Sequence, residues 1–360
     1  MGGGLLQLVA YGAQDVYLTG NPQITFFKVV YRRHTNFSIE SIQQTFNGSA
    51  GPNKRVTCQI SRNGDLVHKL YVVFDSTAAL ADKDARDYIK KVEVEIGGQL
   101  IDRQYGDWMK IWNELTLPAG KKKGYDTMVM NAAANTGKRY VPLEFWFCRN
   151  IGLALPLIAL QYHEVKINIE FDDETTDANF TDATLWADYI FLDTDERRRF
   201  AQLSHEYLIE QLQYTGDETM TNGKLTAKLS FNHPVKELIW RTLKTSTTEF
   251  GASGLAKLML NGNDRFAQRD AKYFTHVQPY QHHTNIPATT SHINVYSFAL
   301  KPEEHQPSGT LNMSRIDTAQ LQLTGGIEGA TTGDCNTKIY AHSYNVLRIL
   351  SGMGGLAYSN

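Results

Sequence analysis

The chain has 360 residues, a net charge of −2 and 21% charged residues. It is long enough for two domains that each bury a core, and it has no overall basic field that would hold nucleic acid. Three scattered cysteines, Cys58, Cys148 and Cys335, are too few for a disulfide framework or a zinc site and fit a reducing compartment such as the cytosol. We expect neither a signal peptide nor a membrane-spanning segment.

Residues 1–26 predict an arm outside the core. They begin with Gly2-Gly3-Gly4 and reach a turn signal at Gly20-Asn21-Pro22. The first of these residues show no apolar alternation, so they offer little to a core.

Beyond the arm, short segments with alternating apolar and polar residues predict half-buried antiparallel strands. Examples are residues 91–96, 166–171, 209–214, 226–231 and 320–324. Turn signals separate such segments, because Asn-Gly supplies the positive φ that tight hairpins need. These signals are Asn63-Gly64, Gly97-Gly98, Asn222-Gly223 and Asn261-Gly262.

Helical signals are few. Residues 105–115 predict a helix with one core-facing stripe, because apolar residues recur at helical spacing. The stripe consists of Trp108, Ile111, Trp112 and Leu115. Asp193, with Glu196 three residues later, predicts the cap of a short helix where the two halves of the chain meet. We expect long loops at residues 118–139, 172–184 and 276–291.

The chain repeats itself at an offset of roughly 155–165 residues, which is the length of a whole domain. An alternating segment with a Gly-Gly turn at 92–99 returns at 258–264 with Asn-Gly, and a closing apolar strand at 188–192 returns at 343–347. The predicted fold is all-β: two tandem eight-stranded jelly-roll sandwiches with a few short helices in loops. We expect the arm at 1–26, the first roll at 27–203 and the second at 204–360. Such a duplication suggests a building block more than an enzyme.

Candidate chemical sites are weak. The four histidines His276, His282, His283 and His292 could bind a metal, but their spacing favours a loop of exposed histidines. Asp172, Asp173 and Glu174 could hold calcium, but they lack the ligand spacing of an EF-hand and favour a solvated loop. We therefore expect no catalytic residue, no metal and no cofactor. Asn179 is a candidate glycosylation site in a loop.

Several long runs of residues are specific. The opening segment 3–28 contains Gly20-Asn21-Pro22, and further runs follow at 31–37, 60–66, 152–165, 261–266, 306–310 and 344–358. These runs resemble major capsid proteins of nucleocytoplasmic large DNA viruses, and the algal-virus and giant-virus branch is the most similar. The resemblance covers nearly the whole chain.

The resemblance implies a double jelly roll whose homotrimers form pseudo-hexagonal capsomers that tile an icosahedral shell. It implies that the arm connects capsomers, and the residues expected to do so are Leu5, Leu6, Tyr11, Asp15, Tyr17, Asn21 and Pro22. Implied partners are the chain itself and minor capsid and penton proteins beneath the shell. An inner viral membrane is expected close by without insertion, and direct nucleic-acid binding is not expected. The implied location is the virion capsid, after synthesis and assembly in the host cytoplasm.

Two alternatives stay open at this stage. The chain could be a minor capsid homologue, or a carbohydrate-binding double jelly roll with aromatic platforms and paired carboxylates in one cleft. Within the capsid family, loops 172–184 and 214–224 look shorter than usual.

Overall fold

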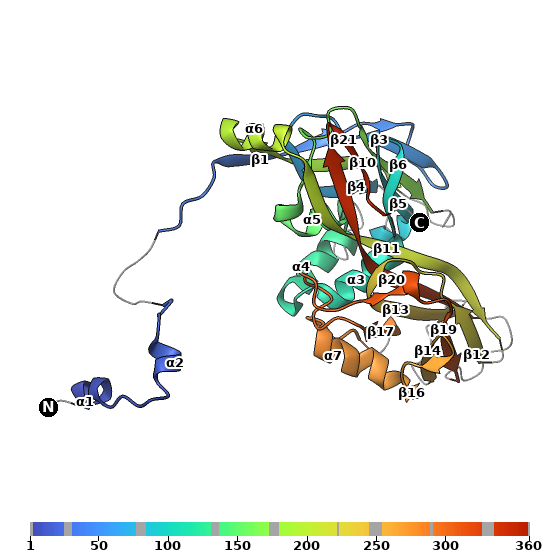
Figure 1. Cartoon of the computed structure of the whole chain (residues 1–360). Helices are drawn as coiled ribbons and strands as arrows, with labels where there is room; N and C mark the ends of the chain where they lie inside the picture. Colours follow the sequence, from blue (N-terminus) through green and yellow to red (C-terminus); the bar gives the residue numbers. More distant parts are fainter. Residues whose placement is uncertain are drawn as a thin grey trace. The chain divides into compact units, whose positions relative to one another are not determined.

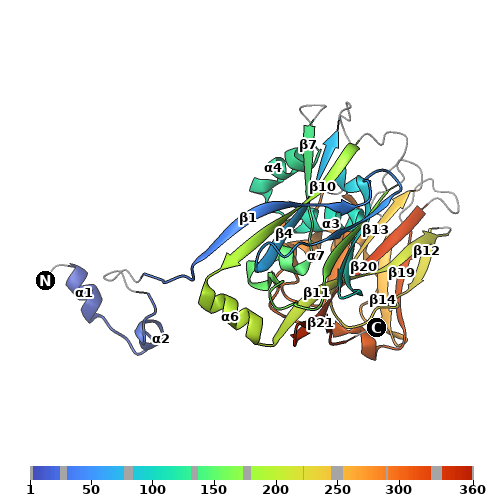
Figure 2. The same cartoon turned by 90° about the horizontal axis from the view of Figure 1, so that it is seen from above.

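The computed structural model describes residues 3–24, 31–76, 84–130, 137–172, 180–221, 223–244, 254–288, 291–325 and 335–358. Contacts within the chain divide it into a first unit, residues 1–36, and a second unit, residues 37–360. The first unit contains two short helices, α1 (Gly3–Val9) and α2 (Val16–Thr19). The second unit is built around four antiparallel sheets (Figures 1 and 2).

Residues 37–192 supply two of these sheets. Sheet I has the strand order β1-β10-β4-β7, with β8 paired to β4, and sheet II has the order β2-β3-β9-β5-β6. The strands of sheet I are β1 (Phe37–Gln44), β10 (Phe180–Leu192), β4 (Leu66–Ser76), β7 (Gly137–Pro142) and β8 (Leu155–Pro156). The strands of sheet II are β2 (Phe46–Asn47), β3 (Arg55–Gln59), β9 (Val165–Phe171), β5 (Ile89–Ile96) and β6 (Gln99–Tyr105).

Residues 205–356 supply the other two sheets. Sheet III has the order β11-β20-β13-β17 with β18 and β21 at its margins, and sheet IV has the order β12-β19-β14-β15 with β16 on β14. The strands of sheet III are β11 (His205–Met220), β20 (Cys335–Leu350), β13 (Pro234–Lys244), β17 (Ile293–Ser297), β18 (Leu311–Asn312) and β21 (Met353–Leu356). The strands of sheet IV are β12 (Lys224–Lys228), β19 (Ala319–Thr324), β14 (Leu255–Leu260), β15 (Asn263–Asp264) and β16 (Arg269–Asp270).

The two halves share one strand order. Once the accessory strands β2, β8, β16, β18 and β21 are set aside, each half has eight strands along the chain. In both halves one sheet runs 1-8-3-6 and the other runs 2-7-4-5. Two such sheets make a jelly roll, so the predicted pair of eight-stranded jelly rolls is confirmed.

Two of the predicted hairpin turns have the expected backbone. Gly97 and Gly98 have φ of 59° and 82°, and Asn261 and Gly262 have φ of 49° and 80°. Positive φ at both central residues gives the turn twist that matches antiparallel strands. Gly64 serves a different purpose, because a Cβ atom at this position would lie 2.8 Å from the Cβ of Tyr189.

The two predicted helices are present. The first is α3 (Gly106–Thr116), and the second is α6 (Thr194–Gln202), whose N-cap Asp193 accepts a hydrogen bond from the Thr194 N–H at 2.8 Å. The remaining helical segments are the 3₁₀ turns at Ala85–Tyr88, Ile151–Leu153 and Met313–Arg315, α4 (Ala119–Met130), α5 (Trp146–Arg149), the π-helix η4 (Tyr273–Val277) and α7 (Gln278–His282).

Two of the expected long loops are instead partly helical. Residues 118–139 contain α4, and residues 276–291 contain the end of η4 and all of α7. The α4 sequence carries two glycines and a weak apolar stripe, so its own propensity is poor. Tertiary contacts compensate, since Tyr125 and Met128 pack against the first core and Lys122 pairs with Glu114 of α3 at 2.7 Å.

Each roll has an apolar core, and a third apolar cluster joins the rolls. The core of the first roll also includes Ile209, Leu347 and Ile349 of the second roll. In that cluster the stripe of α3 packs on the outer face of sheet III. Its members are Trp108, Ile111, Trp112 and Leu115 from α3 and Ile239, Ile293, Val295 and Tyr340 from sheet III. All eight side chains are at most 4% exposed. The stripe expected to face the helix's own core therefore faces the neighbouring roll.

Candidate assembly surfaces and a buried charged joint

The seven residues expected in the assembly arm lie in the first unit. Leu5 and Leu6 belong to α1, Tyr17 belongs to α2, and Asp15 precedes α2. Asp15 is half-buried and the other six are exposed. The Asp15 carboxylate accepts a hydrogen bond from the Gly12 N–H at 2.8 Å, which organises the turn before α2. These helices were not expected, because the opening glycines disfavour helix and the segment shows no apolar alternation.

The predicted acidic loop and glycosylation site are only partly visible. Asp173, Glu174 and Asn179 lie outside the described residues. Asp172 is half-buried, and its N–H donates to the Tyr88 carbonyl at 2.9 Å. Within the described ranges, no three His, Cys, Asp or Glu side chains are grouped to hold a metal ion. In the same part of the chain, no helix is long and apolar enough to cross a membrane.

A cluster of charged and histidine side chains lies between the two rolls, and we call it the charged joint. Its members are Arg149, Glu210, Lys236, Glu237, His283, Glu303, His305 and His342. Arg149 ends α5 of the first roll, and the others come from β11, β13, β20 and the segments around β17 of the second roll. The joint therefore ties the first roll to three strands of sheet III.

Two carboxylates organise the joint. Glu210 pairs with Arg149 at 3.0 Å and with the Lys236 ammonium. Glu237 accepts a hydrogen bond from His342 at 3.2 Å, and its other oxygen lies 3.0 Å from His283 Nε2. A buried carboxylate is tolerated only when it is paired in this way.

Aromatic rings complete the shell around the cations. The Arg149 guanidinium lies 4.6 Å from the centre of the Trp112 ring, and Lys236 Nζ lies 4.8 Å from the centre of the Tyr344 ring. The negative face of an aromatic ring attracts a cation most strongly where water is excluded. Trp112 thus serves both the apolar stripe of α3 and the charged joint.

The joint sets the protonation of His283 and Glu237. Burial alone would lower the pKa of His283, but Glu237 and Glu303 outweigh it and raise that pKa to about 9. Burial alone would raise the pKa of Glu237, but His283 and His342 hold that pKa well below its usual value. His283 is therefore an imidazolium at neutral pH, and its partner is a carboxylate.

The expectation of a loop of exposed histidines is wrong. The His283 side chain is fully buried and His292 is buried, whereas His276 and His282 are half-buried. The two remaining joint histidines, His305 and His342, lie outside this run in sequence. One signal could have revealed the joint: Lys236-Glu237 interrupts an otherwise apolar stretch, which indicates a paired charge inside a sheet.

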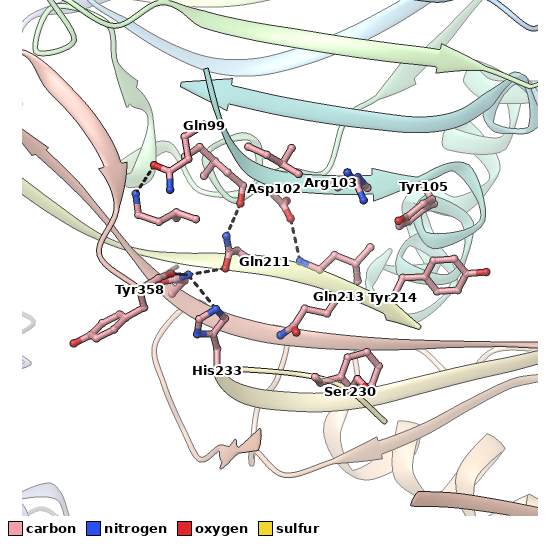
Figure 3. Close-up of a pocket in the computed structure, with 16 residues that line it drawn as sticks. Gln99, Asp102, Arg103, Tyr105, Gln211, Gln213, Tyr214, Ser230, His233 and Tyr358 are labelled. Carbon is pink, nitrogen blue, oxygen red and sulfur yellow. Dashed lines mark hydrogen bonds between the residues drawn. The ribbon is translucent and has the colours of Figure 1, made fainter. Parts of the chain in front are cut away.

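A polar cleft of about 390 Å³ opens where β6 of the first roll faces β11 of the second. Figure 3 shows Asp102 and Gln211 pointing toward each other's strand across it. The Leu212 N–H donates to Asp102 at 3.0 Å, and the Gln211 side-chain amide donates to the Ile101 carbonyl of β6. Burial raises the pKa of Asp102 to about 7. These bonds span the two rolls, so the cleft reads as a second polar link between them.

Two family models match the chain in succession. The model described as "Major capsid protein N-terminus" matches residues 25–193, and the model described as "Large eukaryotic DNA virus major capsid protein" matches residues 196–355. The chain belongs to the major capsid proteins of large eukaryotic DNA viruses. The resemblance found in the sequence is confirmed.

Relatives in this family match along their full length. The major capsid proteins of Pyramimonas orientalis virus and Paramecium bursaria Chlorella virus 1 are 57% and 45% identical, and each alignment covers all of both chains. The alignment with the first runs over 404 positions, more than the 360 residues of this chain, so that relative carries insertions.

Solved structures agree on the fold. The VP54 protein of PBCV-1 is 41% identical, with a TM-score of 0.83 over 93% of this chain and all of that one. The Faustovirus major capsid protein, at 12% identity and a TM-score of 0.75 over 94% of each chain, shares the fold. The protein is therefore a double jelly roll, a structural component of the virion capsid and not an enzyme. The charged joint accordingly has a structural role, because it connects the two rolls.

Proposed function

We propose that three copies of this capsid protein form a capsomer with a pseudo-hexagonal outline, and that such capsomers tile an icosahedral shell. The observation that carries the proposal is the repeated strand order of the two rolls. Three chains of two similar rolls give six similar edges around one axis, and a closed ring of this kind is a common form of homo-oligomer.

The charged joint and the α3 seam support this proposal. Tiling requires that the two rolls keep one fixed orientation within the chain. The α3 stripe and the Arg149–Glu210 pair both cross from one roll to the other. The proposed division is an arm at 1–26, a first roll at 27–203 and a second roll at 204–360. A structure similar to this chain also occurs in a quasi-atomic model of the PBCV-1 virus capsid, with a TM-score of 0.83.

The arm is proposed to connect capsomers. Leu5, Leu6 and Tyr17 on α1 and α2 are exposed. Exposed apolar side chains grouped in this way are typical of surfaces that bind a partner. Minor capsid and penton proteins beneath the shell are the proposed partners of the inner surface, with the viral membrane close by and not penetrated. Synthesis and assembly are proposed to occur in the host cytoplasm.

Electron microscopy of the purified full-length protein tests the proposal. We expect uniform particles with a six-sided outline and three-fold symmetry after averaging, together with hexagonal arrays at high concentration. Particles with two-fold symmetry, or single compact monomers at micromolar concentration, would contradict it.

A further inference from the structure

The outer faces of sheets I and III correspond position by position. In sheet III, Tyr340 of the eighth strand pairs with Ile239 of the third, and Ile239 pairs with Val295 of the sixth. In sheet I, Trp186 of the eighth strand pairs with Tyr71 of the third, and Tyr71 pairs with Pro142 of the sixth. In both sheets the flanking residues point into the roll's own core, so these sets face away from it.

These matched faces differ in what covers them. Sheet III is covered by α3 of the first roll, which buries Ile239 and Tyr340. On sheet I the rings of Trp186, Tyr71 and Tyr140 form a row, with centroids 6.4 and 6.2 Å apart. Trp186 and Tyr71 are half-buried and Tyr140 is 39% exposed.

A cavity lies beside this aromatic row. It measures about 420 Å³ and is lined by Tyr71, Tyr140 and Pro142, with Lys69 and Asp188 among its charged residues. Aromatic rings in such a setting are the usual anchors of protein interfaces.

The helices that follow the fifth strand correspond in the same way. α3 lies between β6 and β7, and the helical stretch η4–α7 lies between β15 and β17. Met109 of α3 belongs to the first core and Phe274 of η4 belongs to the second, which sets the two helices in register.

The next positions on each helix complete the comparison. Trp112 and Leu115 follow Met109 by three and six residues, and the second roll covers both. Three and six residues after Phe274 stand Val277 and Tyr280, which are 39% and 76% exposed. The second helix thus presents apolar residues at the positions that match Trp112 and Leu115, and among the described residues no roll covers them.

We propose that η4–α7 of one copy packs on the outer face of sheet I of the next copy, as α3 packs on sheet III within the chain. This rests on the proposed trimer, because each chain offers one free helix stripe and one free sheet face. The contact is head to tail, and it closes when three copies alternate the internal and external versions around a ring of six rolls. The occupant of the sheet I face is therefore a second copy of the same protein.

The double substitution Val277→Asp with Tyr280→Asp tests the contact. Both side chains are exposed within the chain, so we expect its fold, followed by circular dichroism, to be kept. We expect the dissociation constant of the trimer to rise by roughly 100-fold or more, because buried charges replace an aromatic anchor. Leu350→Asp, at a site 63% exposed on β20, is the matched control and should leave the trimer intact.

Wild-type protein measured in parallel distinguishes a failure of the proposed contact from a failure of the proposed trimer. A wild-type trimer that the double variant also forms, with the same dissociation constant, overturns the contact but leaves the trimer standing. A wild-type monomer overturns both the contact and the proposed capsomer.

Hydroxyl-radical footprinting provides a second, independent readout on the sheet side. We expect Tyr140 to be protected in the wild-type trimer and labelled in the double variant, whereas Tyr162, 75% exposed, is labelled equally in both. Equal labelling of Tyr140 in trimer and monomer would show that the helix docks elsewhere.

Discussion

Single residues in this capsid protein matter most where charge is buried. His283, Glu237 and Glu210 are buried in the joint, and each has partners within 3.0 Å. Pairs of this kind add little stability compared with apolar packing, but the loss of one partner leaves the other charge buried alone. The joint therefore fixes the orientation of the rolls and makes a few positions intolerant of change.

We expect His283→Ala to destabilise the protein by about 3–5 kcal/mol, because it leaves the Glu237 carboxylate without its cation. Urea unfolding of the full-length chain measures the change. The neighbouring His282, whose ring nitrogen bonds the Leu300 carbonyl at 3.0 Å near the surface, is the control. Its replacement by Ala should cost about 1 kcal/mol or less. Equal losses for the two variants would place His283 outside any charged joint.

The raised pKa of His283 predicts a loss of stability at alkaline pH. Its pKa is about 9 in the folded protein and 6.5 in the unfolded chain, so the fold favours the protonated ring. That contribution is complete below pH 6.5 and is lost as the pH rises through about 9. We expect a falling melting temperature over this window in the wild type and a flatter profile in His283→Ala. Parallel profiles for the two proteins would refute the assignment.

The raised pKa of Asp102 also predicts that stability falls as the pH rises, but over a lower pH range. Its pKa is raised from 3.8 to about 7, so the fold favours the protonated carboxyl and loses that contribution as the pH rises through about 7. Asp102→Asn keeps an acceptor for the Leu212 N–H and removes the titration. We expect the gain in stability of the variant over the wild type to grow between pH 4 and 8, as measured by thermal melts. A difference that stays constant with pH would contradict this.

At the scale of elements, the sequence was a good guide wherever packing follows local pattern. The α3 stripe, the Asp193 cap and the Gly97-Gly98 and Asn261-Gly262 turns all follow from side-chain spacing and backbone preference. The helices α4 and α7 were missed because their glycine, proline and lysine residues give them a low helix propensity or a weak apolar pattern. They form through contacts distant in sequence. The joint was missed because its residues come from six segments that are distant in sequence.

The arm is expected to contribute to assembly and not to the stability of the rolls. α1 and α2 bury none of their residues, so they add little to the stability of the rolls. We expect deletion of residues 2–20 to leave the melting temperature of the trimer unchanged and to reduce the yield of shells or arrays in electron micrographs. Loss of soluble trimer after the deletion would show instead that the arm belongs to the fold.

At the scale of the whole molecule, duplication explains why one chain contains two seams of the same kind. The chain fills one of them itself, by placing α3 on sheet III. We propose that the other, a helix stripe and a sheet face, is completed by another copy. The repeat could be recognised from the sequence, but which surfaces it leaves free could be seen only once the strand registers were known.

The mass of the purified protein tests this account most directly. Mass photometry at nanomolar concentration should give about three times the chain mass of 40.6 kDa, because extensive interfaces of this kind survive dilution. A persistent species at 40.6 kDa with a cooperative melt would contradict the account, because a folded monomer would then need no second copy.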